Sequence, residues 1–328
     1  TVTVTVDPEP VVANQAVTIC SDVAINLVLG NDSDGPSAAT YNITAINPSG
    51  LVSSAGFPVT GTGFTANELF NDAWTNKTSA PVNVVYTVVP VSSLGCKGNP
   101  FTVTVTVKPE PVVLNQTITV CSDITTNLLL GSDVDGPSVA SYSITNINSN
   151  TLVSSAGLPV TGTGLAANEL FNDAWTNNTS ASVNVVYTVV PLGVNGCEGD
   201  PFTVTVTVTP EPAVANQTTT SCSDVALGVN FNSSTSVAAA TYNVTALNLR
   251  GLTVSPGTNA AVANGLLATD LANDAFTNTT NAPVNVDYTV VPVTALGCKG
   301  EPFTVTVTVD PEPVVANQAV TICSDVAI

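Results

Sequence analysis

The sequence predicts an all-β fold built from β-sandwich domains in tandem, and three observations support this. The motif Pro-Glu-Pro begins at Pro8, Pro109, Pro210 and Pro311, which gives a period of 101 residues. Between these motifs, runs such as 101–107 alternate valine with threonine, the period-2 pattern of a half-buried strand. Hydrophobic residues make up 44% of the chain, which is enough to bury a core in each repeat.

Each repeat contains about seven short predicted strands separated by turns, which is typical of an immunoglobulin-like Greek-key sandwich. In the first repeat, strands are expected at residues 11–19, 23–29, 39–47, 51–54, 81–91 and 101–107. Turn-forming clusters such as residues 31–36 separate them. Residues 67–74 instead predict a short helical turn that directs Leu69, Phe70 and Trp74 toward the core.

The Pro-Glu-Pro motif also predicts the domain boundaries. We expect the end of a preceding repeat at residues 1–7, three repeats at 8–108, 109–209 and 210–310, and the start of a following repeat at 311–328. Two prolines in three residues fix φ and favour an extended connector, so the repeats are expected to form an extended rod. Residues 1–25 are identical to residues 304–328, which suggests that a three-repeat block was duplicated in a longer array.

Charge and composition exclude several classes of function. The formal net charge is -19 with only five lysine and arginine residues, which argues against nucleic acid or an anionic membrane surface as a partner. No apolar stretch is long enough for a membrane-spanning helix, and no signal-peptide pattern opens the sequence, so direct membrane insertion is not expected.

Catalysis is not expected either. Histidine is absent, which removes the Ser-His-Asp and Cys-His arrangements. Glu68 and Asp72, which recur as Glu169 and Asp173, could form the carboxylate pair of a glycosidase. Their place in a turn that also holds core aromatics favours a structural role.

The cysteines follow the same period in two series. The first series is Cys20, Cys121, Cys222 and Cys323, and the second is Cys96, Cys197 and Cys298. This pattern predicts disulfides formed in an oxidising compartment. Pairing within a repeat, as in Cys20 with Cys96, is preferred and leaves Cys323 unpaired. An alternative remains open, because the first turn and the last hairpin of a seven-stranded sandwich tend to lie at opposite ends. In that case Cys20 would pair with Cys197 of the next repeat.

Two further motifs are candidate ligand sites. The Asp-x-Asp-Gly turns at Asp32, Asp34, Asp133 and Asp135 cluster carboxylates as calcium sites do, but they lack the downstream glutamate of an EF-hand loop. Calcium is therefore the single candidate cofactor, and the absence of the motif from the third repeat argues against an obligatory ion. The aromatic residues Trp74, Trp175 and Phe276 could stack on sugars, but an amphipathic turn favours a place in the core.

Several motifs together carry a family resemblance: Cys20-Ser21-Asp22, the run 67–76, Gly-Cys-x-Gly at 95–98 and the Val-Thr strand at 101–107. In this order they resemble the PKD-like, immunoglobulin-type repeats of giant surface adhesins in Bacteroidetes-type bacteria. The resemblance covers the whole chain. It implies export to the bacterial cell surface by the type IX secretion route and a role in adhesion or gliding.

These observations lead to two hypotheses about function. In the first, the chain is a structural stalk or filament segment of a large extracellular adhesin and acts as a mechanically stable spacer. Its partners would be neighbouring repeats of the same chain, with lateral association into filaments. In the second, the sandwich loops bind glycans or proteins. Short loops that are poor in aromatics favour the spacer.

Overall fold

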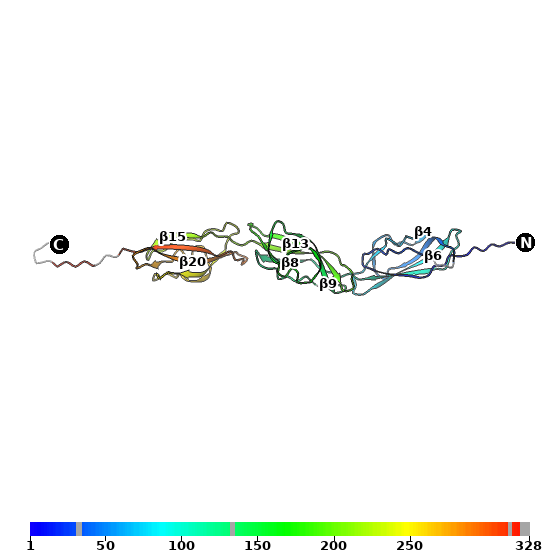
Figure 1. Cartoon of the computed structure of the whole chain (residues 1–328), viewed down its shortest axis with the longest axis horizontal. Coiled ribbons are helices and arrows are strands. Elements are labelled where there is room, and N and C mark those ends of the chain that lie inside the picture. Colours follow the sequence, from blue (N-terminus) through cyan, green and yellow to red (C-terminus); the bar gives the residue numbers. More distant parts are fainter. Residues whose placement is uncertain (31–34, 132–134, 314–316, 322–328) are drawn as a thin grey trace. The chain divides into compact units, whose positions relative to one another are not determined.

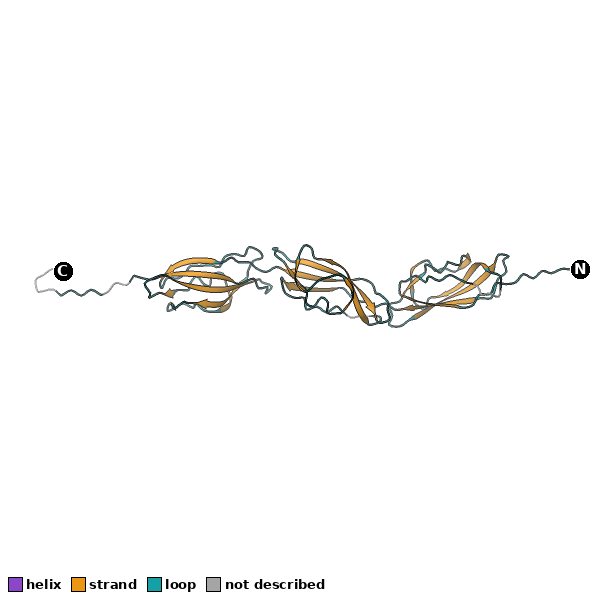
Figure 2. Ribbon diagram, viewed as in Figure 1, coloured by secondary structure: helices purple, strands orange, loops and turns teal. Residues whose placement is uncertain are grey.

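The computed structural model describes residues 1–30, 35–131, 135–313 and 317–321. In these residues it contains strands and turns but no helix (Figures 1 and 2). Contacts between residues group the chain into two units. The first unit consists of Thr1–Ile118, Thr125–Asp173 and Asn184–Val206, and the second of Thr119–Ile124, Ala174–Val183 and Thr207–Ile328. No helix in the described ranges is long and apolar enough to cross a membrane.

Each repeat contributes seven strands within the described residues. In the first repeat they are β1 (Gln15–Cys20), β2 (Ala38–Asn47), β3 (Val52–Ala55), β4 (Gly61–Phe64), β5 (Ala73–Thr75), β6 (Val82–Ser92) and β7 (Phe101–Lys108). In the second they are β8 (Gln116–Cys121), β9 (Val139–Asn148), β10 (Val153–Ala156), β11 (Gly162–Leu165), β12 (Ala174–Thr176), β13 (Val183–Gly193) and β14 (Phe202–Thr209). In the third they are β15 (Gln217–Cys222), β16 (Thr241–Asn248), β17 (Thr253–Val254), β18 (Ala263–Leu266), β19 (Phe276–Thr277), β20 (Val284–Val293) and β21 (Phe303–Asp310).

Every repeat has a large sheet facing a small one. In the first repeat the large sheet has the order β1-β7-β6-β2-β4, and the small sheet pairs β3 with β5. The second and third repeats have the same order. β1 pairs with β7 in parallel, while the neighbouring pairs in the sheet are antiparallel. The chain therefore enters the sheet on one edge strand and leaves it on the next strand in the same direction.

The valine-threonine alternation determines which face of the large sheet is buried. Successive side chains of a strand point to opposite faces, so one residue type can line the core. In β7, Val103, Val105 and Val107 are fully buried, while the threonines between them are partly exposed. The equivalent valines of β14 and β21 are also fully buried. The predicted half-buried strand is confirmed in all three repeats.

In the core of the first repeat, three buried side chains are linked by hydrogen bonds. The Trp74 Nε1 donates to the Tyr86 hydroxyl at 3.0 Å, and that hydroxyl donates to Asp72 Oδ2 at 2.9 Å. Burial raises the pKa of Asp72, and the hydrogen bond from Tyr86 opposes this rise. Trp74, Trp175 and Phe276 are all buried, which confirms that they belong to the core.

The predicted strand at 23–29 and the predicted helical turn need correction. Residues 23–29 form no regular strand, because the segment is bent by left-handed backbone at Asp22 (φ 60°) and Asn26 (φ 50°). Its amides still donate to the chain around β5, as in Ile25 N to Asp72 O at 2.8 Å. The turn at 67–74 is a series of i to i+3 turns without a helix. Its Leu69 is buried as predicted, but Phe70 is 38% exposed. Apart from these local differences, the all-β tandem sandwich fold is confirmed.

Candidate functional site

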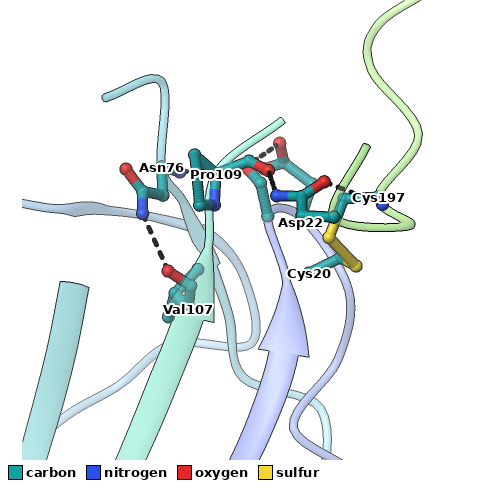
Figure 3. Close-up of a disulfide and its surroundings, with 8 residues drawn as sticks. Cys20, Asp22, Asn76, Val107, Pro109 and Cys197 are labelled. Atoms are coloured by element: carbon teal, nitrogen blue, oxygen red, sulfur yellow. Dashed lines mark hydrogen bonds between the residues drawn. A yellow bond between two sulfur atoms is a disulfide. The ribbon is translucent and has the colours of Figure 1, made fainter. Parts of the chain in front are cut away.

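A disulfide joins Cys20 to Cys197 at the end of the first repeat (Figure 3). A joint is the place where one repeat, the Pro-Glu-Pro connector and the next repeat meet. At the first joint the two Cα atoms are 5.5 Å apart, and 177 residues separate the cysteines in sequence. The second joint has the equivalent bond between Cys121 and Cys298, with the same Cα distance of 5.5 Å and the same separation of 177. Each joint, with its disulfide, lies within one of the two units.

The predicted pairing of cysteines within a repeat is wrong for these four residues. β1 places Cys20 opposite Lys108, the last residue of the parallel strand β7. Cys96 precedes Phe101, the first residue of β7. The eight residues of β7 span roughly 26 Å, whereas the Cα atoms of a disulfide lie within about 7 Å. The sandwich topology thus separates the two cysteines, and the alternative pairing with the next repeat is the one observed.

The other cysteines are not bonded as predicted. Cys96 has a free, half-buried thiol, and Cys222 has a free, exposed thiol. The predicted bond between Cys222 and Cys298 is therefore also wrong, because Cys298 belongs to the second joint. The predicted unpaired Cys323 lies outside the described residues.

The second cysteine of each repeat lies on a tight hairpin that packs against the connector. In the second repeat, Gly193 N donates to Cys197 O at 2.8 Å, and Gly199 N donates to Pro191 O at 2.9 Å. A Cβ atom on Gly199 would lie 2.0 Å from Pro111 O, so the last glycine of Gly-Cys-x-Gly permits a close approach of two backbones. The connector thereby positions the hairpin cysteine at the joint.

On the side of the joint formed by the first repeat, a buried asparagine makes several hydrogen bonds. The Asn76 Nδ2 donates to Val107 O at 2.8 Å (Figure 3). It also donates to Ala80 O at 3.0 Å, and the Asn76 side chain is fully buried. Its backbone N donates to Ser21 Oγ at 2.9 Å. Asn177 and Asn278 make the same side-chain contacts in the other repeats. We call this arrangement the asparagine latch, because its hydrogen bonds connect the loop after β5 to the C-terminal ends of β1 and β7.

The glutamate of the connector is buried in the first joint. Glu110 is only 2% exposed, and its Oε1 lies 3.8 Å from Lys77 Nζ. Lys77 also donates to Asp200 Oδ2 of the next repeat at 3.0 Å. Burial, together with the nearby Asp22 and Asp200 carboxylates, raises the pKa of Glu110 to about 7, although Lys77 opposes the rise. The first joint thus contains a disulfide, the ion pair between Lys77 and Asp200, and the carboxyl group of Glu110, which can remain protonated.

The second joint differs in its charges. Asn178 occupies the position of Lys77, and Glu301 occupies that of Asp200. Burial, with Asp123 and Glu301 nearby, raises the pKa of Glu211 to about 7. A cavity at this joint is lined by Asp123, Glu211, Lys299 and Glu301. The lysine that lines this cavity lies on the hairpin of the following repeat, whereas Lys77 of the first joint lies in the loop after β5.

The connector glutamates make the stability of the chain depend on pH. The folded pKa values of Glu110 and Glu211, about 7, lie above the ordinary 4.5, so the folded chain binds more protons than the unfolded chain. Their stabilising contribution to the free energy of unfolding is complete below pH 4.5 and is lost as the pH rises through about 7. We therefore expect the thermal midpoint to fall between about pH 5 and pH 8, and the variant Glu110→Gln/Glu211→Gln to show a flatter profile in calorimetry.

The matched control for this experiment is Glu9→Gln. Glu9 occupies the same motif position at the start of the first repeat, but its side chain is exposed. The control should keep the pH profile of the parent chain. An unchanged profile in the double glutamine variant would show that other groups cause the dependence.

Most of the candidate calcium ligands lie outside the described residues. Asp32, Asp34 and Asp133 lie outside the described residues, and Asp135 is exposed, with its carbonyl accepting from Val112 N at 3.2 Å. Within the described part of the chain, no cluster of three or more potential metal ligands is found. The calcium hypothesis thus stays a prediction.

Two of the candidate glycosidase carboxylates, Asp72 and Asp173, make contacts inside the core. Asp72 and Asp173 accept hydrogen bonds from Tyr86 and Tyr187 inside the core. Burial raises the pKa of Asp173 to about 6, and the hydrogen bond from Tyr187 opposes this rise. A Cβ on Gly56 would approach Asp72 Oδ1 to 2.2 Å, so the small sheet also packs closely around this carboxylate. These contacts support the structural role expected for Asp72 and Asp173.

The joint residues Asn76, Lys77 and Glu110 were not predicted from the sequence. A buried asparagine and a buried glutamate are uncommon, and sequence alone does not indicate burial of either. One signal was available, because Asn-x-Thr recurs at Asn76, Asn177 and Asn278 with the repeat period. Such a repeated position in a loop indicates a structural contact.

Comparisons with known proteins identify a family. The sequence pattern of the PKD-like domain matches residues 17–111, 118–212 and 219–313. No curated protein matches the chain. Among solved structures, the I67–I69 fragment of the titin I-band is similar at 10% identity, covering 94% of this chain and 100% of that fragment, with a TM-score of 0.33.

Two other solved structures are similar at the same level. Drosophila N-cadherin EC1-4 has 15% identity, covers 93% of this chain and 76% of its own, and has a TM-score of 0.23. Chicken CNTN1 FN1-FN3 has 10% identity, covers 93% and 98%, and has a TM-score of 0.28. The matches of the PKD-like domain cover most of the chain and recur three times along it. This protein therefore belongs to the PKD-like domain family.

Proposed function

We propose that the chain is a tension-bearing spacer, a stalk or filament segment of a large extracellular surface adhesin. The observation that carries this proposal is the covalent bond across each joint, Cys20 to Cys197 and Cys121 to Cys298. The spacer units would be the repeats 8–108, 109–209 and 210–310. Disulfides persist in oxidising compartments, which supports a place outside the cytoplasm. Export by the type IX route to a bacterial cell surface, for adhesion or gliding, belongs to the same proposal.

The strand arrangement of each repeat supports resistance to tension. β1 and β7 are parallel and pair at six positions, from Gln15 opposite Val103 to Cys20 opposite Lys108. The chain enters this pair at the Val103 end and leaves it at the Lys108 end. Tension that enters through β1 and leaves through β7 and the connector therefore shears the two strands past each other, and their hydrogen bonds are loaded together and not one after another. The third repeat has the same pairing between β15 and β21.

The disulfide extends this arrangement to the next repeat. Cys20 ends β1, and its bond to Cys197 connects that edge strand directly to the hairpin of the second repeat. Tension that leaves the first repeat is thus shared between the connector and the disulfide. In the chain-entropy account, a bond that closes a loop of 177 residues stabilises the folded state by roughly 5 kcal/mol.

Solution scattering tests the spacer proposal. If each repeat extends roughly 35–45 Å, three repeats in line give a radius of gyration of about 35 Å. A single compact body of 328 residues would have a radius of gyration of about 20 Å. We expect the larger value in the oxidised chain. A value near 20 Å would contradict the extended spacer.

An adhesive module that binds through sandwich loops is the second candidate, and one observation favours it. Phe57 is 91% exposed and Leu158 is 83% exposed, and both occupy the same place in the loop after the first strand of the small sheet. Exposed apolar residues at a repeated position are typical of a binding surface. A glycan array probed with the parent chain and with Phe57→Ser/Leu158→Ser tests this candidate. Binding that the double variant loses would support it, while no binding by the parent chain supports the spacer.

A further inference from the structure

The first strand of the small sheet has an open edge in the first two repeats. The small sheet contains only two strands, and β3 pairs with β5 on one side. Within the described residues, no backbone hydrogen bond joins Val52–Ala55 to any other strand. All four residues of β3 are exposed, as are all four residues of β10. The backbone groups on the outer side of these two strands are therefore accessible to a further strand.

An apolar side chain next to this edge is held in an exposed position. Gly56 follows β3 with a positive φ of 78°, and a Cβ there would lie 2.2 Å from Asp72 Oδ1. The backbone N of Phe57 donates a hydrogen bond to the Asp72 carboxylate. The buried carboxylate thus fixes the backbone at Phe57, while the side chain of Phe57 remains 91% exposed. A groove of about 360 Å³ is lined by residues 53–57.

The second repeat has the same feature, with a repeat on each side of it. Residues 51–56 and 152–157 are identical in sequence, and Gly157 has the same positive φ (72°) beside Asp173. Leu158 is 83% exposed although one repeat precedes it and another follows it. Its exposure is therefore a property of a repeat inside the array and does not depend on either end of the chain.

The third repeat lacks these features. Pro256 stands at the position of Ala55, and Thr258 stands at the position of Phe57. The equivalent strand β17 is two residues long, and a Cβ on Gly257 would have no neighbour within 4 Å. Proline has no amide to donate to a further strand, which is one way in which edge strands are kept from pairing. The open edge and the exposed apolar side chain thus occur together in two repeats and are absent together from the third.

The charges near this edge suit a second copy of the chain. Residues 35–67 and 136–168 contain no charged residue, although the chain has a net charge of -19. In a contact between identical surfaces, each acidic group would face an acidic group of the other copy, so an uncharged surface is favoured. Asp22 contacts β3 through Ser54, and its hydrogen bonds with Ser54 and Thr75 stabilise its charge within its own repeat.

Two further points favour a second copy over another partner. Leu158 has no ring to stack on a sugar, so an apolar protein surface suits both repeats better than a glycan does. A partner that binds both edges must also carry two matching sites at the same separation, and a copy of this chain necessarily does. Two-fold symmetry then makes the contact identical for both copies.

We propose that the edges of β3 and β10 pair antiparallel with the same edges of a second copy of this chain, and that Phe57 and Leu158 pack against the strands of that copy. The proposal rests on the proposed function, because it describes how one spacer chain associates laterally with another. Each contact is small, since β3 has four residues and a register shift between Ser53 and Ala55. Two phenyl rings bury about 300–500 Å², less than the roughly 1,000 Å² of a stable interface. We therefore expect association to need both repeats.

Sedimentation velocity of the oxidised full chain, with its free thiols alkylated, tests the proposal at physiological salt. We expect the parent chain to show a concentration-dependent equilibrium between monomer and dimer. Phe57→Thr/Leu158→Thr gives both repeats the residue of the third repeat and should raise the dissociation constant of the dimer by roughly tenfold or more. The control is Val262→Thr, which removes a 61% exposed apolar side chain from the third repeat and should leave this constant unchanged.

A second pair of variants tests the backbone pairing. Ala55→Pro/Ala156→Pro gives both edges the proline of the third repeat, whereas Ala55→Ser/Ala156→Ser keeps both amides. We expect the proline variant to weaken dimerisation by roughly tenfold and the serine variant to dimerise as the parent chain does. Amide hydrogen exchange gives an independent measurement on the parent chain. Protection of residues 52–57 and 153–158 should increase with protein concentration, because these amides become hydrogen-bonded across the contact.

Several results would overturn the proposal. They are a parent chain that stays monomeric at about 1 mM, an equal effect of Val262→Thr, equal effects of the proline and serine variants, and association without protection of these amides. Binding of a glycan through Phe57 by a chain that does not self-associate would also overturn it. If the dilute chain is extended in scattering, each of these results would leave the spacer function in place and remove only the lateral contact.

Discussion

Reduction of the two disulfides should increase the fully extended length between Cys20 and Cys298 from roughly 260 Å to roughly 950 Å. In the reduced chain, all 278 residues between these cysteines (298 − 20) can be stretched. In the oxidised chain, tension passes from Cys20 to Cys197 through the first bond, runs back to Cys121, and crosses the second bond to Cys298. Only the 76 residues between Cys121 and Cys197 (197 − 121) can then extend.

Single-molecule stretching with and without a reducing agent measures this difference. The variant Cys197→Ser retains one bond and leaves the 101 residues from Cys20 to Cys121, so its extended length should be roughly 340 Å. Pairing within each repeat would instead leave two stretches of 25 residues, 96–121 and 197–222, and an extended length of roughly 170 Å. A length near 170 Å in the oxidised chain would contradict the stapled joints.

Loss of the asparagine latch should destabilise a repeat by about 3 kcal/mol. The Asn278 Nδ2 donates to Val309 O at 2.7 Å and to Ala282 O at 3.0 Å, and its Oδ1 accepts from Thr280 N at 3.0 Å. Asn278→Ala removes these bonds from a side chain that is almost fully buried, so polar backbone groups lose partners that water does not replace. For a repeat of this size, the loss corresponds to a thermal midpoint lower by roughly 12–24 °C.

Calorimetry of the full chain measures this effect, with Asn285→Ala as the control. Asn285 lies in the same repeat and accepts from Thr308 Oγ1 at 3.0 Å, but on the exposed face. We expect its midpoint to change by no more than about 3 °C, since an exposed hydrogen bond contributes little. Equal shifts in both variants would show that burial of the latch does not determine its contribution.

Much of the fold could be predicted from the sequence because its signals are local. The alternation in 101–107 alone indicates a half-buried strand, and the structure places Val103, Val105 and Val107 in the core. The residues that interrupt this pattern were harder to predict. A segment rich in apolar residues at 23–29 looks like a strand, but the left-handed backbone at Asn26 prevents a regular ladder. Phe70 is apolar, yet the consecutive turns around it leave it partly exposed.

The joints could be predicted less well, because their chemistry depends on which strands become neighbours. The cysteine spacing is equally compatible with pairing inside and between repeats. Only the parallel pairing of β1 with β7 separates Cys20 from Cys96. The same dependence applies to Glu110, which looks like a solvated connector residue until the end of one repeat and the hairpin of the next enclose it. Exposed Glu9 has the same sequence context, so burial of this glutamate is a property of the joint and not of the motif.

The central claim is that covalent bonds cross the joints between repeats, and peptide mapping under non-reducing conditions tests it most directly. The oxidised chain should yield two linked peptide pairs, one that contains Cys20 and Cys197 and one that contains Cys121 and Cys298. Linked pairs that join Cys20 to Cys96 and Cys121 to Cys197 would contradict the claim, because the bonds would then lie inside the repeats and the joints would have no covalent link besides the connector.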